Sequence, residues 1–305
     1  MNNYQLGLIM NSCISVMCVI SVFIITSLSG MFSLGQAAFM CISAYITFII
    51  AKLFGLPIIV TAIIGIGISA LCAYIIAIPT LKLRKDYFAL ITMGFGEMIS
   101  SIVIMLEKYT NGAIGYSRIP KVKSIFWIIV VLTVLSVFFA WALKRSRFGR
   151  MCIALKTDET AARSFGIDVY HMKVKVFVIA SCISSMAGIL YGLKNRVITP
   201  DTFSWNLSAE MQIFLFFGGT NSLIGSVISA FTLKILPELL RTVSIFGISL
   251  QEFRTVIYCI MILIVINFRP SGLLGEKELS IDSVRNLIGK IKSRKTRIAE
   301  GGKNE

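Results

Sequence analysis

Residues 144–175, KRSRFGRMCIALKTDETAARSFGIDVYHMKVK, form the longest polar interval between two hydrophobic segments of this chain. The interval contains eight lysines and arginines. Loops that concentrate positive charge in this way mark the cytoplasmic side of helical membrane proteins. The side on which this loop lies fixes the direction of the segments that flank it, and alternation then orients the rest of the chain.

The composition excludes a soluble globular protein. The chain has 305 residues, of which 56% are hydrophobic, and its mean hydropathy is +0.83. Several apolar runs are about 20 residues long, the length that a helix needs to cross a bilayer. We therefore expect an all-α polytopic membrane protein. The net charge of +15 lies in loops beside the apolar runs and in the tail, which indicates contact with membrane lipid and not with nucleic acid.

Hydrophobicity predicts eight or nine membrane segments, two of which form a discontinuous or re-entrant pair. The loops at 82–85 and 144–175 and the tail from Arg269 hold 20 of the 30 lysines and arginines. This bias predicts an N-terminus outside and a C-terminus in the cytoplasm. The N-terminus has no basic region before its first apolar run, so we expect a retained span and no cleaved signal peptide. The predicted segments are 6–28, 34–54, 57–80, 87–106, 124–143, 174–193, the pair 207–217 and 222–240, and 253–268.

The predicted pair at 207–217 and 222–240 is interrupted by FGGTNSLIG at 217–225. Irregular backbone at membrane depth requires cover from protein or a water-filled cavity, and discontinuous helices often line transport pathways. The alternative is a short cytoplasmic turn between two ordinary spans. A similar stretch of small and polar residues, SLGQAAF, lies at 33–39. The candidate pathway residues in these stretches are Gln36, Gly218, Gly219 and Asn221.

The segment KDYFALITMGFGE at 85–97 carries a third candidate site. Glu97 lies about 16 Å into a predicted span, where a carboxylate is costly unless it faces protein or water. Gly94 and Gly96 would let a helix or a substrate approach the backbone. The alternative is a structural glutamate that holds two helices together.

Within the basic loop, residues 157–166 predict a short helix at the membrane surface. Thr157 is the expected N-cap, Asp158 and Glu159 lie where the helix dipole favours negative charge, and Gly166 ends the helix in a left-handed conformation. Such a helix would suit docking to another protein; the alternative is an ordinary solvated loop. The residues expected on one apolar face are Ala161, Ala162 and Phe165.

Sites for chemistry are not evident in the sequence. Six of the seven cysteines lie in hydrophobic segments, and Cys152 lies in the basic loop. No pair has metal-ligand spacing, and His171 is the single histidine. There is no phosphate-binding loop motif. We therefore expect no enzyme, no cofactor and no metal, and any ATP hydrolysis would need another chain.

Five motifs occur together and in order: SLGQAAF, KDYFALITMGFGE, TDETAARSFGI at 157–167, FGGTNSLIG, and FRPSGLLG at 268–275. Together they resemble the permease subunit of a branched-chain amino-acid ABC importer, over about residues 33–275. In that family the loop at 144–173 carries the coupling helix, whose E-x-A-A-x-x-x-G pattern would be Glu159, Ala161, Ala162 and Gly166 here. The chain departs from the family at TNGAIGY, 110–116, and at Gln36, where the family has histidine.

The resemblance implies a subunit of the bacterial plasma membrane that carries leucine, isoleucine or valine. It implies three kinds of partner: a second homologous permease, two cytoplasmic ATPase subunits and an extracytoplasmic substrate-binding protein. An importer for urea or short amides is an alternative, and so is an ion-coupled secondary transporter. A secondary transporter should show a relay of embedded acids, but Glu97, Glu210 and Glu238 form no evident pair. An integral membrane enzyme is a further alternative, but it needs a convergent polar site that the sparse acids do not provide.

The chain divides into a permease domain, 1–275, and a tail, 276–305. Apolar residues at helical spacing in the tail predict a basic amphipathic helix on the membrane surface, followed by a disordered end. A solvated tail with no role is the alternative. The apolar stripe is Ile281, Val284, Leu287, Ile288 and Ile291.

Overall fold

The computed structural model describes residues 3–81, 85–117, 119–122 and 124–240, together with 244–245, 248–249, 256, 260 and 263. Most of the span predicted at 253–268 lies outside the described residues, and so does the whole tail at 276–305. The predictions for these two segments therefore stay predictions.

Six helices in the described part of the chain are long and apolar enough to cross a membrane. Their positions agree with the first six predicted spans, although α9 begins five residues earlier than expected. An apolar surface on every side suits helices that lie in lipid or in the centre of a bundle. They are α1 (Asn3–Phe23) continued by a π-helical turn η1 (Ile24–Leu28), α2 (Gln36–Phe54), α3 (Ile58–Thr80), α4 (Lys85–Met105), α6 (Ile125–Arg145) and α9 (Val169–Asn195).

Two shorter helices follow, α10 (Trp205–Gly218) and α11 (Leu223–Leu240). They correspond to the predicted pair, and Gly219–Ser222 separates them. The other elements connect the long helices: α5 (Glu107–Thr110), η2 (Gly112–Ile114), α7 (Arg147–Thr157), α8 (Glu159–Ser164) and η3 (Pro200–Phe203). A two-residue antiparallel pairing, β1 (Ser244–Ile245) with β2 (Ile248–Ser249), follows α11.

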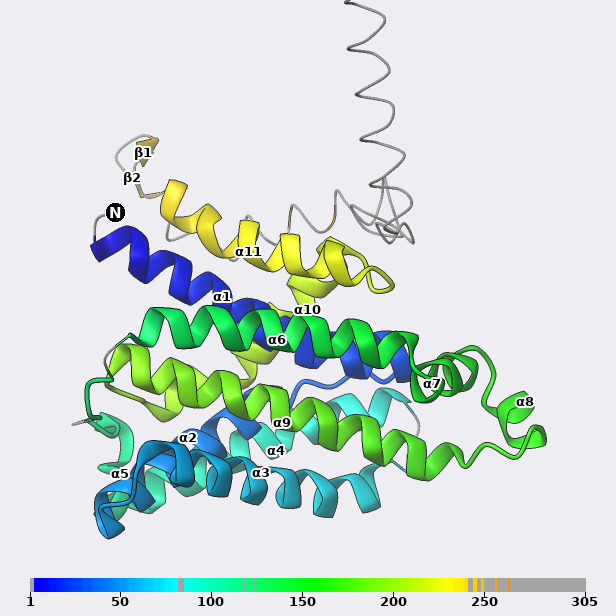
Figure 1. The fold of residues 1–305 in the computed structure, drawn as a ribbon, viewed down its shortest axis with the longest axis horizontal. Coiled ribbons are helices and arrows are strands. Elements are labelled where there is room, and N and C mark those ends of the chain that lie inside the picture. The colour runs from blue at the N-terminus through cyan, green and yellow to red at the C-terminus, as the bar shows by residue number, and fades with distance from the viewer. Residues whose placement is uncertain are drawn as a thin grey trace, which may run out of the picture.

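The long helices lie roughly side by side in one bundle, with α7 and α8 projecting from one end and α5 at the other (Figure 1). We call these the α8 end and the α5 end. Helices α1, α2 and α9 are mostly buried, whereas in α3, α4 and α6 most residues are only partly buried or exposed. The exposed side chains on α3, α4 and α6 are largely apolar, as lipid or a second membrane subunit requires.

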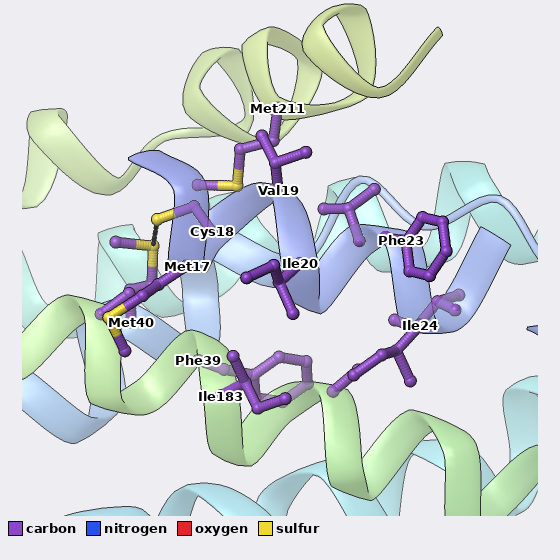
Figure 2. Close-up of a cluster of buried hydrophobic side chains, with 14 of the residues drawn as sticks. Met17, Cys18, Val19, Ile20, Phe23, Ile24, Phe39, Met40, Ile183 and Met211 are labelled. Carbon is purple, nitrogen blue, oxygen red and sulfur yellow. Dashed lines mark hydrogen bonds between the residues drawn. The ribbon is translucent and has the colours of Figure 1, made fainter. Parts of the chain in front are cut away.

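Small residues bring α2 and α9 into close contact. A Cβ on Gly188 would lie 2.4 Å from the backbone oxygen of Met40, so no larger residue fits there. The hydroxyl of Ser43 donates to the backbone oxygen of Ser185, 3.0 Å away. Close helix packing through glycine and serine is typical of membrane bundles. Figure 2 shows the neighbouring apolar cluster, in which Phe39 and Met40 face side chains of α1.

Helix α2 begins inside the bundle and not at its end. The hydroxyl of Ser184, near the middle of α9, donates to the backbone oxygen of Gln36, the first residue of α2. The amide of Leu34 donates to Thr92 in the middle of α4, 3.1 Å away. Residues 29–35 therefore run from the end of η1 back into the bundle, which explains the small and polar character of SLGQAAF.

Candidate transport and coupling sites

The basic loop contains two helices, α7 and α8, and Asp158 joins them. Thr157 is the last residue of α7, and its hydroxyl donates to the backbone oxygen of Ile153, 3.0 Å away. The carboxylate of Asp158 instead accepts hydrogen bonds from the amides of Thr160 and Ala161, at 2.8 and 3.1 Å. The prediction that Thr157 caps the helix was wrong. Asp158 has the extended backbone that an N-cap requires, and its charged oxygens are the better acceptors at a helix N-terminus.

The predicted end of this helix is confirmed at Gly166, whose φ is +77°. The amide of Gly166 donates to the oxygen of Arg163, and the amide of Ile167 donates to the oxygen of Ala162. These two bonds form a Schellman motif, which satisfies the last carbonyl groups of α8.

The three residues predicted to share one apolar face of α8 do not share it. Ala162 is only 2% exposed, because it packs onto this chain, whereas Phe165 is 86% exposed and Ala161 is also exposed. Residues four apart lie on one side of a helix, so Ala161 and Phe165 form the outward face. The exposed surface of α8 therefore includes Ala161 and Phe165 but not Ala162.

Glu159 is engaged within the chain. Its carboxylate lies 2.7 Å from the ammonium of Lys173, a residue of α9 that is 9% exposed. This ion pair fixes α8 against the first turns of α9. Beside it, Asp168 accepts hydrogen bonds from the backbone amide and the ring of His171, and these bonds hold the pKa of the Asp168 carboxyl below its usual value.

Three predicted pathway residues, Gly218, Gly219 and Asn221, lie together at the turn between α10 and α11. A Cβ on Gly218 would lie 2.4 Å from the backbone oxygen of Gly225, and Gly219 has a φ of +108°. Glycine avoids the steric clash at position 218 and the backbone strain at position 219. The turn lies at the α8 end of the bundle, because the side-chain oxygen of Asn221 accepts a 2.8 Å hydrogen bond from Lys156 of α7.

A polar layer surrounds the start of α2. The Gln36 side chain is fully buried, and neither its nitrogen nor its oxygen has a hydrogen-bond partner within the described ranges. The amide of Ala37 donates to the hydroxyl of Ser208, at 2.9 Å, and the nitrogen of Gln212 donates to the backbone oxygen of Ser33, at 3.3 Å. Both Ser208 and Gln212 belong to α10. The stretch SLGQAAF and the first half of α10 are therefore neighbours in the structure.

The α4 site lies on the outer side of the single chain. Glu97 is exposed, and its carboxylate accepts a 3.4 Å hydrogen bond from the amide of Trp205 at the start of α10. Gly94 is exposed and Gly96 is buried, yet a Cβ on either would meet no described atom within 4 Å. The close approach expected at these glycines is therefore not made by the described part of this chain.

Two residues that connect these sites, Gln212 and Lys156, were not predicted as site residues from the sequence. Gln212 had a usable signal, because a glutamine inside an apolar helix is costly without a partner. For Lys156 the sequence offers no such signal, because one lysine in a basic loop does not indicate which turn it contacts. Its partner, Asn221, lies 65 residues later in the chain.

Comparison with known proteins identifies the family. Residues 4–266 match the family described as the permease component of branched-chain amino acid transport systems. The chain belongs to this family.

Relatives with curated names agree with this assignment. The chain is 26% identical to the high-affinity branched-chain amino acid transport system permease protein LivM of Escherichia coli K12, over 82% of this chain and 65% of that protein. It is 24% identical to a probable LivM permease of Methanocaldococcus jannaschii, over 77% of this chain and 72% of that protein. A third relative is LivH of E. coli K12, 27% identical over 58% of this chain and 57% of its own length. The chain thus spans 65% of the E. coli LivM that it matches.

A solved structure, PsaBC from Streptococcus pneumoniae in complex with Fab, resembles the fold with a TM-score of 0.51. The match covers 86% of this chain and 90% of that one at 15% identity. At this identity the similarity concerns the fold alone.

Proposed function

We propose that this chain is a transmembrane permease subunit of an ATP-driven importer of branched-chain amino acids in a bacterial plasma membrane. The observation that carries the proposal is the match of residues 4–266 to the permease family of branched-chain amino acid transport systems. The relatives named LivM and LivH point to the same substrate class and to two different permeases in one system. The chain itself would catalyse no covalent step.

In the proposed assembly, the α8 end faces the cytoplasm and the α5 end faces the outside. The charge of the 144–175 loop supports this orientation, which puts the N-terminus outside and the C-terminus inside. Helices α10 and α11 then act as a broken pair, and with 253–268 they bring the number of membrane segments to eight or nine.

The proposed partners occupy different surfaces. A second permease covers the exposed face of α4, so that Glu97, Gly94 and Gly96 border the pathway between the two subunits. An extracytoplasmic binding protein delivers the amino acid at the α5 end. Two ATPase subunits bind the α8 ends of the two permeases, where Phe165 projects 86% exposed from this chain.

Coupling would run from α8 through α7 to α10. The ion pair of Glu159 with Lys173 keeps α8 and α9 together as one piece, and the hydrogen bond of Lys156 to Asn221 attaches α7 to the turn after α10. When the ATPases close and displace α8, this connection would shift α10, whose Ser208 and Gln212 border the start of α2 near Gln36. The pathway would thereby close to one side of the membrane and open to the other.

Co-purification tests the proposal. The chain is expressed with its genomic neighbours for an ATPase, a second permease and a binding protein, and a tag on this chain is used for capture from detergent. We expect both the ATPase and the second permease to be recovered with it, and the ATPase to be lost when Ala161 and Phe165 are both replaced by aspartate. Recovery of this chain alone in all conditions would contradict the proposal.

A further inference from the structure

A cavity of about 670 Å³ lies between α1, α2, α9, η3, α10 and α11, outside the residues assigned above to the pathway. Its size falls within the range of small-molecule sites. It extends toward the α5 end, because the last turns of α9, through Tyr191, and the following turn η3, through Asp201, line it. It is thus in the half of the bundle that the proposed binding protein would face.

One wall of the cavity is aliphatic. Ile14 and Cys18 of α1 and Met40 of α2 line it, and each is at most 3% exposed. Cys18 donates to the sulfur of Met40 across 3.7 Å, as the dashed line in Figure 2 marks. Leu207 and Ile213 of α10 extend the apolar lining. A branched aliphatic group would bury its surface against these side chains.

The lining also carries charge of both signs. Glu210 of α10 lies 3.2 Å from Lys234 of α11, and their side chains keep 23% and 27% of their surface exposed. Asp201 of η3 also lines the cavity. Charged residues inside membrane helices are expensive, and they typically mark substrate or ion pathways. An ion pair that only joined two helices would not need to face a cavity.

We infer that this cavity is a transient binding site for a zwitterionic α-amino acid with an aliphatic side chain. Lys234 contacts the substrate carboxylate, Glu210 and Asp201 contact its ammonium, and the wall of Ile14, Cys18 and Met40 receives the side chain. The inference rests on the proposed function and deepens it, because it places a substrate site within one permease subunit. Glu210 lies in α10 and the turn at Asn221 follows this helix, so movement of α10 at the α8 end would also change this site.

Trp205 lines the cavity and gives a direct readout. The chain has three tryptophans, and the other two, Trp127 and Trp141, lie on α6. The full chain with Trp127→Phe and Trp141→Phe is placed in lipid nanodiscs, and Trp205 emission is followed during titration with L-leucine. We expect a saturable change. The analogues 4-methylpentanoate, which lacks the ammonium, and 3-methylbutylamine, which lacks the carboxylate, should each bind at least about tenfold more weakly, because each loses one ionic contact.

Variants separate a binding role from a structural one. Glu210→Gln and Lys234→Gln should each raise the half-saturating leucine concentration at least about tenfold. Lys175→Gln, at an exposed position of α9 outside the cavity, should leave it unchanged. The double exchange Glu210→Lys with Lys234→Glu keeps an ion pair between α10 and α11. It should fold like the wild type yet bind leucine weakly, because the two charged groups have changed places around the substrate.

The inference is overturned if leucine gives no saturable change, if both analogues bind as well as leucine, or if the exchanged double variant binds leucine with wild-type affinity. This outcome is distinct from failure of the proposed function. That failure would appear as loss of ATPase co-purification, whereas Trp205 reports on the chain without partners.

Discussion

The ammonium of Lys156 lies 2.8 Å from the side-chain oxygen of Asn221 and donates a hydrogen bond that joins α7 to the turn between α10 and α11. Lys144, at the end of α6, donates to the backbone oxygen of the same asparagine. A hydrogen bond from a charged donor contributes about 1.5–3 kcal/mol. Asn221 is therefore the point where the basic loop holds the end of the short helix α10.

Replacing Asn221 with alanine should uncouple ATP hydrolysis from transport. Asn221→Ala removes the acceptor for Lys156 but keeps the backbone oxygen that Lys144 contacts. In the reconstituted importer, we expect the number of amino acids imported per ATP to fall roughly tenfold, which corresponds to the loss of about 1.4 kcal/mol of coupling. The matched control is Arg150→Gln on α7, an exposed residue whose guanidinium donates to the backbone oxygen of Arg145, and it should keep the wild-type ratio. An unchanged ratio in Asn221→Ala would show that this contact carries no coupling.

Replacing Phe165 with alanine should weaken ATPase binding without destabilising the chain. The side chain is 86% exposed, so its truncation removes no packing within the chain, and the free energy of unfolding should change by less than about 0.5 kcal/mol. An aromatic anchor at the centre of an interface contributes about 2 kcal/mol or more, so the affinity for the ATPase should fall roughly 30-fold. Titration of the ATPase against the purified variant measures the affinity, and thermal unfolding of the variant measures its stability. Wild-type affinity would remove Phe165 from the interface.

Ala162 should behave in the opposite way. It is 2% exposed and packs within the chain, so Ala162→Asp would bury an unpaired charge in the loop itself. The cost is several kcal/mol, and it should appear as rapid proteolysis near α8 in the isolated permease, before any partner is added. Ala161→Asp serves as the control, because Ala161 is exposed. If Ala162→Asp resists protease as the wild type does, Ala162 is not a packing residue.

Gly188 and Gly96 should differ in their tolerance of a side chain. The added Cβ of Gly188→Ala would lie 2.4 Å from the backbone oxygen of Met40, whereas that of Gly96→Ala would meet no described atom within 4 Å. Overpacking of a tight contact costs about 1–3 kcal/mol. Thermal unfolding in detergent should therefore show a clear loss for Gly188→Ala and little change for Gly96→Ala. Equal stability of the two variants would contradict the α2–α9 packing described above.

The sequence alone predicted those features that depend on local composition. Long apolar runs place the six long helices, because the bilayer length and the backbone hydrogen-bond requirement allow little else. Gly166 identified the end of α8, because a left-handed helix terminus favours glycine. The prediction of Thr157 as the N-cap of α8 was wrong, because the adjacent Asp158 is an equally good candidate and only the backbone conformation decides between them.

Features that depend on distant contacts could not be predicted in this way. The inward direction of Ala162 depends on how α8 rests against α9, which helical spacing does not specify. The pairing of Glu159 with Lys173 and of Lys156 with Asn221 depends on the tertiary arrangement. Gly94 and Gly96 were expected to admit a close neighbour, but close contacts within the described chain occur at other glycines, among them Gly188 and Gly218.

Uptake of radiolabelled leucine into proteoliposomes tests whether this chain is part of an ATP-driven importer. The vesicles contain this chain with the second permease and the ATPases, and the binding protein and leucine are added outside. If the proposed function is correct, uptake requires both ATP inside the vesicles and the binding protein outside. A proton or sodium gradient without ATP should drive no uptake. Leucine accumulation driven by an ion gradient in vesicles that contain this chain alone would contradict it.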